Sequence, residues 1–323
     1  MNNYPIVLAH GIARFDIVRQ IILDDIRALV PGFDFPTDEL HYFRNIGSHL
    51  RQNGFEVFHP NVDFAGGVKQ RAADLATEID AFLRTTTHEK VHIIAHSMGG
   101  LDARHMLFHN HQQMKDRVAS LTTIGTPHLG TSFADWGMNR VGHQELDVIK
   151  TLFGLDITGF ADLSTPVCMR YNNEMEDFEA TNAVFYQTYG ASQSLVKTFS
   201  LIKFSWQIIR RLEGHLAHRG ASDGLVSLRS QWWKATLRAQ NGTVKRIPQH
   251  RFGVPADHLN EIGWWDLDEL NLGQWWHHLD WWSPKAFENK IKAQYLEIAQ
   301  RLRNIYKFNF SKEVELLAHV LRA

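Results

Sequence analysis

Short apolar runs alternate with longer amphipathic segments along the chain. The apolar runs predict strands, and the segments whose apolar residues recur every three or four positions predict helices. Strands separated by helices pair in parallel through right-handed crossovers. The pattern therefore predicts an α/β fold with a mostly parallel central sheet flanked by helices. The expected strands are 4–9, 55–59, 91–95, 118–124 and 184–190, and the expected helices are 16–29, 39–53, 68–84, 98–109 and 285–306.

Residues 131–182 do not follow this alternation and read as irregular chain. Their large apolar residues stand among polar and glycine positions, and we expect part of a cap over a functional site. No repeat, low-complexity tract or proline-rich linker divides the chain. Its 323 residues, 44% of them hydrophobic, can bury one large core. We therefore expect a single domain over 1–323, with cap or lid insertions at about 131–182 and 194–213.

The segment 194–213 has the apolar spacing of one amphipathic helix. Two interpretations stay open. A mobile lid helix would meet lipid with its apolar face, whereas a fixed cap helix would pack that face on the core. The apolar stripe consists of Leu195, Phe199, Ile202, Trp206 and Ile209, and the basic residues beside it are Lys197, Lys203, Arg210 and Arg211.

Ser97 is the candidate nucleophile. It follows the apolar run 91–94 and precedes the helix-forming segment 101–107, and a strand, a sharp turn and a helix make up a nucleophile elbow. Ala95 and Gly99, two residues before and two after the serine, are small enough to let strand and helix approach closely. The string is an A-x-S-x-G variant of the usual G-x-S-x-G. The alternative is an ordinary serine in a strand-to-helix loop.

An early strand ends at His10-Gly11, and the loop after it is the expected source of one oxyanion donor. In folds with a nucleophile elbow, one backbone N–H comes from such a loop and the other from the residue after the nucleophile. Ile12 and Met98 occupy these positions. Fixed N–H donors stabilise the oxygen that becomes negative during ester attack. The alternative is that His10-Gly11 only ends a strand.

Asp223 and His258 are the candidate acid and base. The order Ser97, Asp223, His258 is the order that a serine triad takes in folds with this elbow. His258 would accept the Ser97 proton, and Asp223 would orient the imidazole and stabilise its charged form.

Other residues compete for these two roles, because the chain has 19 histidines. Asp257 is a rival acid. Its side chain should point away from the adjacent His258, and we expect a solvated loop carboxylate there, as is usual for aspartate. The rival bases are His250, His277 and His278.

With these motifs in this order, the chain resembles the bacterial triacylglycerol lipases, which have the α/β-hydrolase fold. The resemblance implies a serine ester hydrolase of lipase type that cleaves acylglycerol esters through an acyl-enzyme. It carries over Ser97, Asp223 and His258 as the catalytic residues and Ile12 and Met98 as the oxyanion donors. It gives His128 no catalytic role, and we expect that side chain to brace its loop. The matching segments are 7–11, 95–100, 124–131, 222–226 and 257–259.

Three alternatives fit the same residues. A short-chain carboxylesterase or an acyltransferase would use the same triad and differ only in the pocket or the acceptor. A non-catalytic ligand-binding member of the fold belongs to another class, since a fold alone does not establish a function.

The chain departs from the secreted members of that family at two points. Those lipases often carry one disulfide, but Cys168 is the single cysteine and cannot form an internal one. They also often hold calcium with a carboxylate two residues after the catalytic histidine, where this chain has Asn260. Since calcium prefers carboxylate oxygens, we expect no calcium site and no cofactor. No tight His, Cys or Asp spacing indicates zinc, although the many histidines leave a zinc site open.

Composition limits the partners and the location. The formal net charge of −1 and the pI of about 7.0 offer no electrostatic footprint for nucleic acid. No apolar run of about 18 residues predicts a membrane span. The first core strand begins near Tyr4, which leaves no room for a leader, so the chain reads as cytoplasmic. A mature secreted chain given without its leader, or a chain exported without a classical signal, would look the same in sequence. The expected partners are an ester or lipid substrate and, under the lid interpretation, a lipid interface.

Tryptophan is concentrated after His258. The cluster would form an acyl-binding wall or interface anchor, or it would pack the C-terminal helix on the sheet, since tryptophan suits both settings. Its members are Trp264, Trp265, Trp275, Trp276, Trp281 and Trp282.

Overall fold

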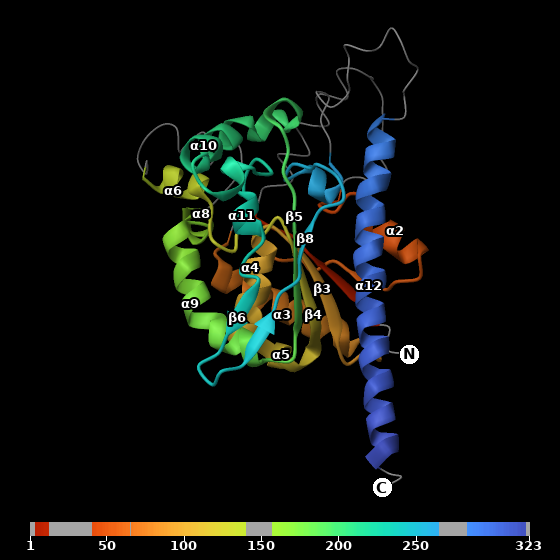
Figure 1. Ribbon diagram of the computed structural model, residues 1–323. Helices are drawn as coiled ribbons and strands as arrows, with labels where there is room; N and C mark the ends of the chain where they lie inside the picture. The colour runs from red at the N-terminus through yellow and green to blue at the C-terminus, as the bar shows by residue number, and fades with distance from the viewer. Residues whose placement is uncertain (1–3, 13–40, 65, 140–156, 265–282, 321–323) are drawn as a thin grey trace.

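The computed structural model describes residues 4–12, 41–64, 66–139, 157–264 and 283–320 (Figure 1). The expected helix 16–29 lies outside these residues, as do His277, His278 and five of the six clustered tryptophans.

A six-stranded sheet forms the centre of the molecule. Its strand order is β2-β1-β3-β4-β5-β8, and every neighbouring pair is parallel. The prediction of a mostly parallel α/β sheet is confirmed. β8 was not expected, because the sequence Gln-His-Arg gives no apolar run. The strands are β1 (Ile6–Ala9), β2 (Val57–Phe58), β3 (Val91–His96), β4 (Val118–Ile124), β5 (Phe185–Gly190) and β8 (Gln249–Arg251).

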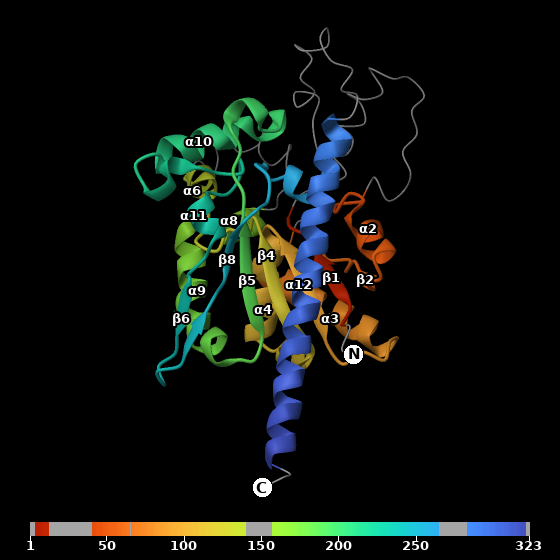
Figure 2. The same ribbon diagram turned by 45° about the vertical axis from the view of Figure 1, so that its right-hand side comes forward.

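Helices cover both faces of the sheet (Figures 1 and 2). On one face α3 (Val68–Arg84) packs beside α4 (Met98–Phe108), and α9 (Thr165–Thr181) contacts α4. On the other face α12 (Ser283–Val320) crosses the strands and packs on α2 (Ile46–Gln52). In the part of the chain that the structure describes, no helix is long and apolar enough to cross a membrane.

Shorter elements complete the chain. A two-stranded antiparallel hairpin, β6 (Thr236–Arg238) and β7 (Val244–Arg246), stands apart from the main sheet. The remaining helical turns are η2 (His111–Gln113), α5 (Met114–Arg117), α6 (Ser132–Met138), α8 (Ile157–Asp162), η3 (Leu195–Lys197), η4 (Ser200–Ile202), α10 (Lys203–Glu213), η5 (Ala217–Gly220), α11 (Leu228–Gln231) and η6 (Asn260–Ile262).

The strands bury side chains on both faces, which is why they read as continuous apolar runs. In β3, Ile94 belongs to the core cluster that contains α2 and α12 residues. Its neighbours Ile93 and Ala95 belong to the second cluster, with α3 and α4. Because successive side chains of a strand point to opposite faces, His92 and His96 share the α12 side with Ile94.

The predicted helices 68–84 and 98–109 match α3 and α4. The described part of 39–53 is helical only from Ile46, and the helix predicted at 285–306 runs on to Val320. Along α12 the buried residues Ile291, Tyr295, Ile298 and Leu302 follow spacings of three and four, which fixes the face that packs on the sheet.

The expectation of irregular chain at 131–182 was wrong for most of its described part, where α6, α8 and α9 form, and residues 140–156 lie outside the described residues. The longest of the three helices is α9. This helix contacts α4 and the β6–β7 hairpin, so it flanks the sheet. Its buried face includes two polar residues, Asn172 and Glu179, which interrupt the apolar stripe. Arg104 on α4 binds both of them, at 2.8 Å and 2.6 Å. A buried partner from another element thus makes this polar face possible.

The cap segment (residues 194–213) is not the single continuous helix that its spacing predicted. Two 3₁₀ turns precede α10, and the chain between them is extended at Thr198 and non-helical at Phe199. The Asp257 carboxylate accepts a hydrogen bond from Phe199 N at 2.6 Å. A side-chain acceptor of this kind competes with the helical hydrogen bond of the same N–H. Phe199, Ile202 and Ile209 are buried in the core, as the packed interpretation expects.

Candidate active site

Ser97 lies at the sharp turn between β3 and α4, with φ 56° and ψ −134°. A residue other than glycine at such a positive φ costs on the order of 1–3 kcal/mol, so the surroundings must hold it there. Ser97 N donates to Ile124 O at 2.9 Å. Thr126 Oγ1 donates to Ser97 O at 2.8 Å. The strained serine and the strand–turn–helix context are those expected of a nucleophile elbow.

Two glycines allow the close approach of backbones around Ser97. A Cβ at Gly99 would lie 2.6 Å from His10 O, so the glycine lets α4 begin against the end of β1. A Cβ at Gly11 would lie 2.6 Å from Ser97 Cβ and 2.8 Å from Tyr42 Oη. Both positions require glycine because any side chain would displace the serine turn or the loop after β1.

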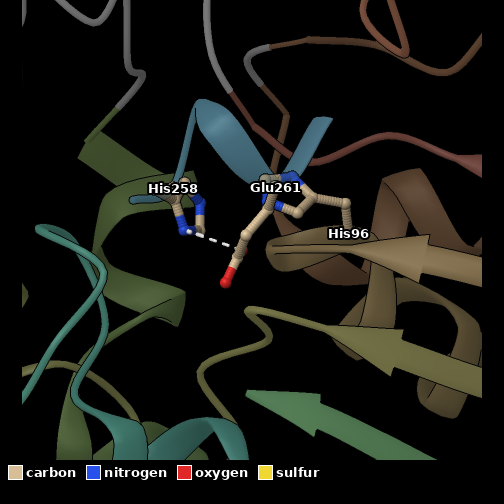
Figure 3. Close-up of side chains that lie close together, drawn as sticks. All are labelled: His96, His258 and Glu261. Atoms are coloured by element: carbon tan, nitrogen blue, oxygen red, sulfur yellow. Dashed lines mark hydrogen bonds and ion pairs between the residues drawn. The ribbon is translucent and has the colours of Figure 1, made fainter. Parts of the chain in front are cut away.

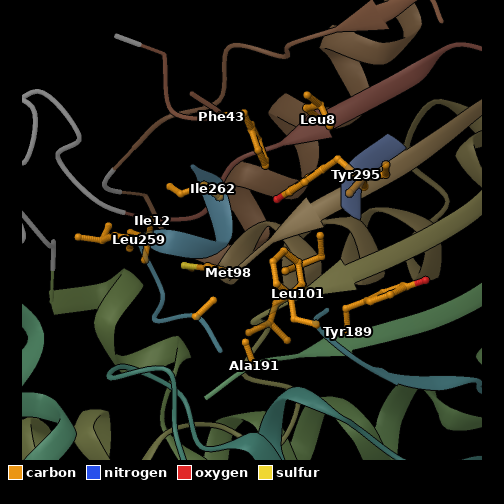
Figure 4. Packing of buried hydrophobic residues seen from close by; sticks show 14 of the residues in the cluster. Leu8, Ile12, Phe43, Met98, Leu101, Tyr189, Ala191, Leu259, Ile262 and Tyr295 are labelled. Atoms are coloured by element: carbon orange, nitrogen blue, oxygen red, sulfur yellow. The ribbon is translucent and has the colours of Figure 1, made fainter. Parts of the chain in front are cut away.

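The expected oxyanion donors lie on either side of this contact. Ile12 and Met98 are both buried in the core cluster shown in Figure 4. Met98 is the first residue of α4, and the first N–H groups of a helix have no acceptor within the helix. Gly11 N donates to Tyr42 Oη at 3.0 Å, which leaves Ile12 as the next N–H of the loop.

Asp223 and His258 are joined by two hydrogen bonds. His258 Nδ1 donates to Asp223 Oδ2 at 2.8 Å, and His258 N donates to Asp223 O at 2.8 Å. The other carboxylate oxygen of Asp223 accepts from Leu225 N and Val226 N, at 2.8 Å and 2.7 Å. The carboxylate is buried, charge-stabilised by these amides and aimed at one ring nitrogen, which fixes the orientation and tautomer of the imidazole.

The His258 ring also lies beside the serine turn. Its centroid is 4.4 Å from that of His96, the residue that precedes Ser97. The serine turn follows β3, and the loop of the oxyanion donor follows β1. Because the strand order reverses between β1 and β3, these groups meet at the carboxyl ends of strands at a topological switch point, where open α/β sheets bind ligands.

His250 is separate from this site. It lies on β8, where its Nε2 is 3.1 Å from Arg301 Nη1. Its ring stacks on Tyr189 at a centroid distance of 4.7 Å. His250 therefore joins the sheet edge to α12.

Asp257 is buried, so the expectation of a solvated carboxylate was wrong. The carboxylate accepts hydrogen bonds from Phe199 N, Leu259 N and Asn260 N, at 2.6, 2.9 and 2.8 Å. Burial, aided by the nearby negative charge of Asp223, raises the pKa of Asp257 to about 7. Its oxygens hold the turn around His258 and the cap segment, and they do not pair with the imidazole.

Asn260 also has a structural place. Its Oδ1 accepts from Asp257 N at 3.0 Å, and its Nδ2 donates to Trp264 O at 2.9 Å. The side chain closes the turn after His258. Trp264 is buried, which fits the packing interpretation for this one member of the tryptophan cluster.

His128 braces its loop, as expected. Its Nε2 lies 2.8 Å from Thr123 Oγ1, and its ring stacks on Trp233 at 4.7 Å. Asn172 Nδ2 donates to His128 O at 2.7 Å. These contacts hold the loop after β4 from three elements.

Sequence reasoning missed three residues of the site, namely Tyr42, His96 and Glu261. His96 Nδ1 lies 2.7 Å from Tyr42 Oη, and His96 Nε2 lies 3.1 Å from Glu261 Oε2 (Figure 3). Burial lowers the pKa of His96 well below its usual value. Burial, and then the charges of Asp223 and Asp257, raise the pKa of Glu261 well above its usual value. No local sequence motif predicts these contacts, because they join segments that are far apart along the chain.

Among the described residues, His96, His258 and Glu261 are also the one group whose donor atoms could hold a metal ion. Their ligand atoms lie within 4.8 Å of one another. Two imidazoles and a carboxylate suit zinc. The same side chains also make hydrogen bonds, between His96 and Glu261, His96 and Tyr42, and His258 and Asp223, and a metal ion would have to displace some of these contacts.

Known proteins resemble this chain over most of its length. Residues 4–207 match the family described as alpha/beta hydrolase fold. Triacylglycerol lipase 2 of Saccharomyces cerevisiae is 26% identical over 286 residues, which cover 80% of each chain. A triacylglycerol lipase of Pseudarthrobacter phenanthrenivorans is 32% identical over 152 residues, 46% of this chain and 38% of the relative. The crystal structure of Staphylococcus hyicus lipase has a TM-score of 0.58 at 18% identity, covering 94% of this chain and 97% of the other.

Proposed function

Since this chain belongs to the α/β-hydrolase fold family, we propose that it is a lipase-type serine hydrolase that cleaves acylglycerol esters. The observation that carries the proposal is the His258–Asp223 hydrogen bond of 2.8 Å beside the strained Ser97 turn. Together they supply the nucleophile, the base and the group that orients the base, which is the arrangement that serine acyl transfer requires.

In the proposed reaction Ser97 Oγ attacks the ester carbonyl while His258 accepts the serine proton. Asp223 stabilises the imidazolium that forms, and the N–H groups of Ile12 and Met98 bind the developing oxyanion. The imidazolium returns its proton to the departing alcohol, which leaves an acyl-enzyme. Water, deprotonated by His258, then releases the fatty acid and restores Ser97.

The relatives and the surface of the cap segment support this substrate class. The relatives reported above are triacylglycerol lipases, and the cap segment carries exposed apolar residues, namely Val196, Phe204 and Leu212. This segment packs on the Asp223 loop, because a Cβ at Gly224 would lie 2.7 Å from Ile202 Cδ1. Exposed apolar groups next to the site would contact an aggregated lipid substrate.

Substitution of the triad tests the proposal. Ser97→Ala, His258→Ala and Asp223→Ala should each lower kcat on an activated ester by about 10³-fold or more, and the triple variant should lose little beyond Ser97→Ala, because the three act as a unit. A serine-reactive phosphonate should label the wild type and not Ser97→Ala. Normal turnover by Ser97→Ala would refute the proposal, and absence of both labelling and turnover in the wild type would favour a ligand-binding protein.

Acyl-chain length separates a lipase from its nearest alternatives. Rates on esters from short to long acyl chains, below and above substrate solubility, should rise when long-chain substrate aggregates. Activity confined to soluble short-chain esters would assign a carboxylesterase. Transfer of the acyl group to an added alcohol in preference to water would assign an acyltransferase.

A further inference from the structure

We propose that Tyr42, His96 and Glu261 are positioning residues that join the oxyanion loop to the loop of the catalytic base through one chain of hydrogen bonds. The chain begins at Gly11 N and ends beside His258. The proposal rests on the catalytic roles proposed above for Ile12 and His258 and adds residues that do not touch the substrate.

Three contacts make up the chain. Tyr42 Oη accepts from Gly11 N at 3.0 Å, and it lies 2.7 Å from His96 Nδ1. His96 Nε2 lies 3.1 Å from Glu261 Oε2. Both ring nitrogens of His96 are thus used, which fixes the orientation of the imidazole between Tyr42 and Glu261.

The sheet geometry places His96 where this chain needs it. His96 ends β3 and shares the α12 side of the strand with Ile94, whereas the serine turn begins one residue later. Its ring therefore faces Tyr42 and Glu261 instead of the α3 and α4 side. The contact is tight on the far side of Glu261 as well, because any Cβ at Gly125 would overlap Glu261 Oε2.

Hydrogen bonds to backbone carbonyls attach the Tyr42 segment to the loop after His258. Trp264 Nε1 donates to Tyr42 O at 3.1 Å, and Arg44 N donates to Ile262 O at 3.0 Å. From α12, Tyr295 Oη donates to Glu261 O at 3.0 Å. A displacement of the His258 loop would therefore move Tyr42, and through it Gly11 and the Ile12 N–H.

The chain ends against the catalytic base. Glu261 Oε2 lies 3.8 Å from His258 Nδ1, the same nitrogen that hydrogen bonds to Asp223 Oδ2 at 2.8 Å. A displacement of the Glu261 side chain would therefore change the surroundings of the catalytic imidazole.

Tyr42→Phe tests the link to the oxyanion loop, because it removes the hydroxyl and keeps the ring. We expect kcat to fall about 10- to 100-fold with KM changed less than about threefold, since a small misplacement of a catalytic donor acts on the transition state. Tyr171→Phe is the matched control. It also removes a buried hydroxyl, which donates to Asp162 Oδ1 at 2.8 Å outside the site, and it should keep the wild-type kcat.

Phosphonate labelling of each variant reports the fraction of protein with a competent Ser97, so misfolding is counted separately. A Tyr42→Phe enzyme with kcat within about twofold of the wild type, or a Tyr171→Phe enzyme that loses as much, would overturn the positioning role. Failure of the proposed function itself is distinguishable, because the wild type would then show no Ser97-dependent turnover.

Glu261→Leu tests the end of the chain beside His258, because it removes the oxygens that His96 Nε2 contacts. We expect kcat to fall as in Tyr42→Phe. Glu261→Gln keeps the shape and a group that can hydrogen bond to His96 Nε2, so its kcat should stay within about threefold of the wild type. Equal losses in Glu261→Gln and Glu261→Leu, or a wild-type kcat in Glu261→Leu, would overturn this part of the proposal.

Discussion

Arg71 joins three parts of the chain beneath the site. From α3 its Nε donates to Asp102 Oδ2 on α4 at 2.8 Å, and its Nη2 donates to His10 O at the end of β1 at 2.8 Å. Its Nη1 donates to Asp63 O. Burial raises the pKa of Asp102 to about 6, although the Arg71 charge opposes that rise. The Arg71 and Asp102 side chains are both buried, so each charge is stabilised by the other.

Arg71→Leu should therefore destabilise the fold by about 3–5 kcal/mol, because it leaves the Asp102 charge buried without a partner. Urea unfolding measures the loss. Arg84→Leu is the control, since Arg84 is 74% exposed in its ion pair with Asp80 and its loss should cost less than about 1 kcal/mol. Equal effects of the two substitutions would contradict this account of Arg71.

Asn260 motivates a prediction about metal. The resemblance to secreted lipases aligns it with a carboxylate that often binds calcium there, and in this chain its side chain closes the turn between Asp257 and Trp264. We expect activity and melting temperature to be unchanged after incubation with a chelator strong enough to remove calcium. A fall that added calcium or zinc restores would show that a metal ion supports the site.

At the scale of an element, the cap segment has two kinds of apolar residue. Phe199 is 3% exposed and lies in the core, whereas Phe204, on α10, is 53% exposed. Trp206, from the same predicted stripe, donates its Nε1–H to Gln193 O at 2.9 Å. Packing therefore accounts for Phe199, and the outward face of α10 carries the residues available to lipid.

Phe199→Ser should destabilise the fold by about 3–5 kcal/mol, since it removes a buried ring and leaves a cavity. Activities on soluble short-chain and emulsified long-chain esters should fall together, with a lowered melting temperature. Retention of the soluble-ester activity with selective loss on emulsions would contradict packing and favour the lid interpretation for this residue.

Phe204→Ser should have the opposite profile. Stability should change by less than about 1 kcal/mol because the ring is already half in water, and turnover on emulsified long-chain esters should fall while soluble-ester activity stays. Val244→Ser is the matched control, because Val244 is equally exposed but lies on the β6–β7 hairpin (Figure 1). An equal fall in Val244→Ser would remove the lipid-contact role from the cap segment.

At the scale of the whole molecule, buried histidines and buried acids oppose each other in the dependence of stability on pH. Burial lowers the pKa of eight histidines in the described part of the chain, so between about pH 4 and 6.5 the unfolded chain binds protons that the native one does not. Stability then rises with pH. Burial raises the pKa of three carboxyl groups, and there stability falls as pH rises. The groups are His10, His49, His92, His96, His105, His111, His128 and His250 against Asp102, Asp257 and Glu261.

Because the histidines outnumber the acids, the melting temperature should rise from pH 5 to a maximum between about pH 6 and 7. Above that range the histidines no longer contribute, and Asp257, whose pKa is about 7, and Glu261 make stability decline. Calorimetry across pH 5–8 measures the profile. A melting temperature highest at pH 5 would mean that the acids dominate.

The sequence by itself determined five of the six strands of the described sheet and the sharp turn at Ser97, the proposed nucleophile. Strands such as Ile6–Ala9 and the turn at Ser97 are specified by residues within a few positions of each other. Apolar runs, small residues beside the serine and the glycine that ends β1 act locally, so a pattern of short period reveals them. Family membership follows from the same segments, and the confirmed α/β fold needs no long-range contact to be recognised.

Only the tertiary structure decided which polar residues are buried and what they bind. His96 and Glu261 are 165 positions apart, and Tyr42 and His96 are 54 apart. The sequence predicted a solvated Asp257, and Asn172 and Glu179 interrupted the apolar pattern by which α9 would have been predicted. Both errors arise because a single polar residue looks the same in sequence whether it faces water or a distant partner. Burial of such a group is stable only when the fold supplies that partner, and the partner is chosen by how the strands and loops pack, not by neighbours along the chain.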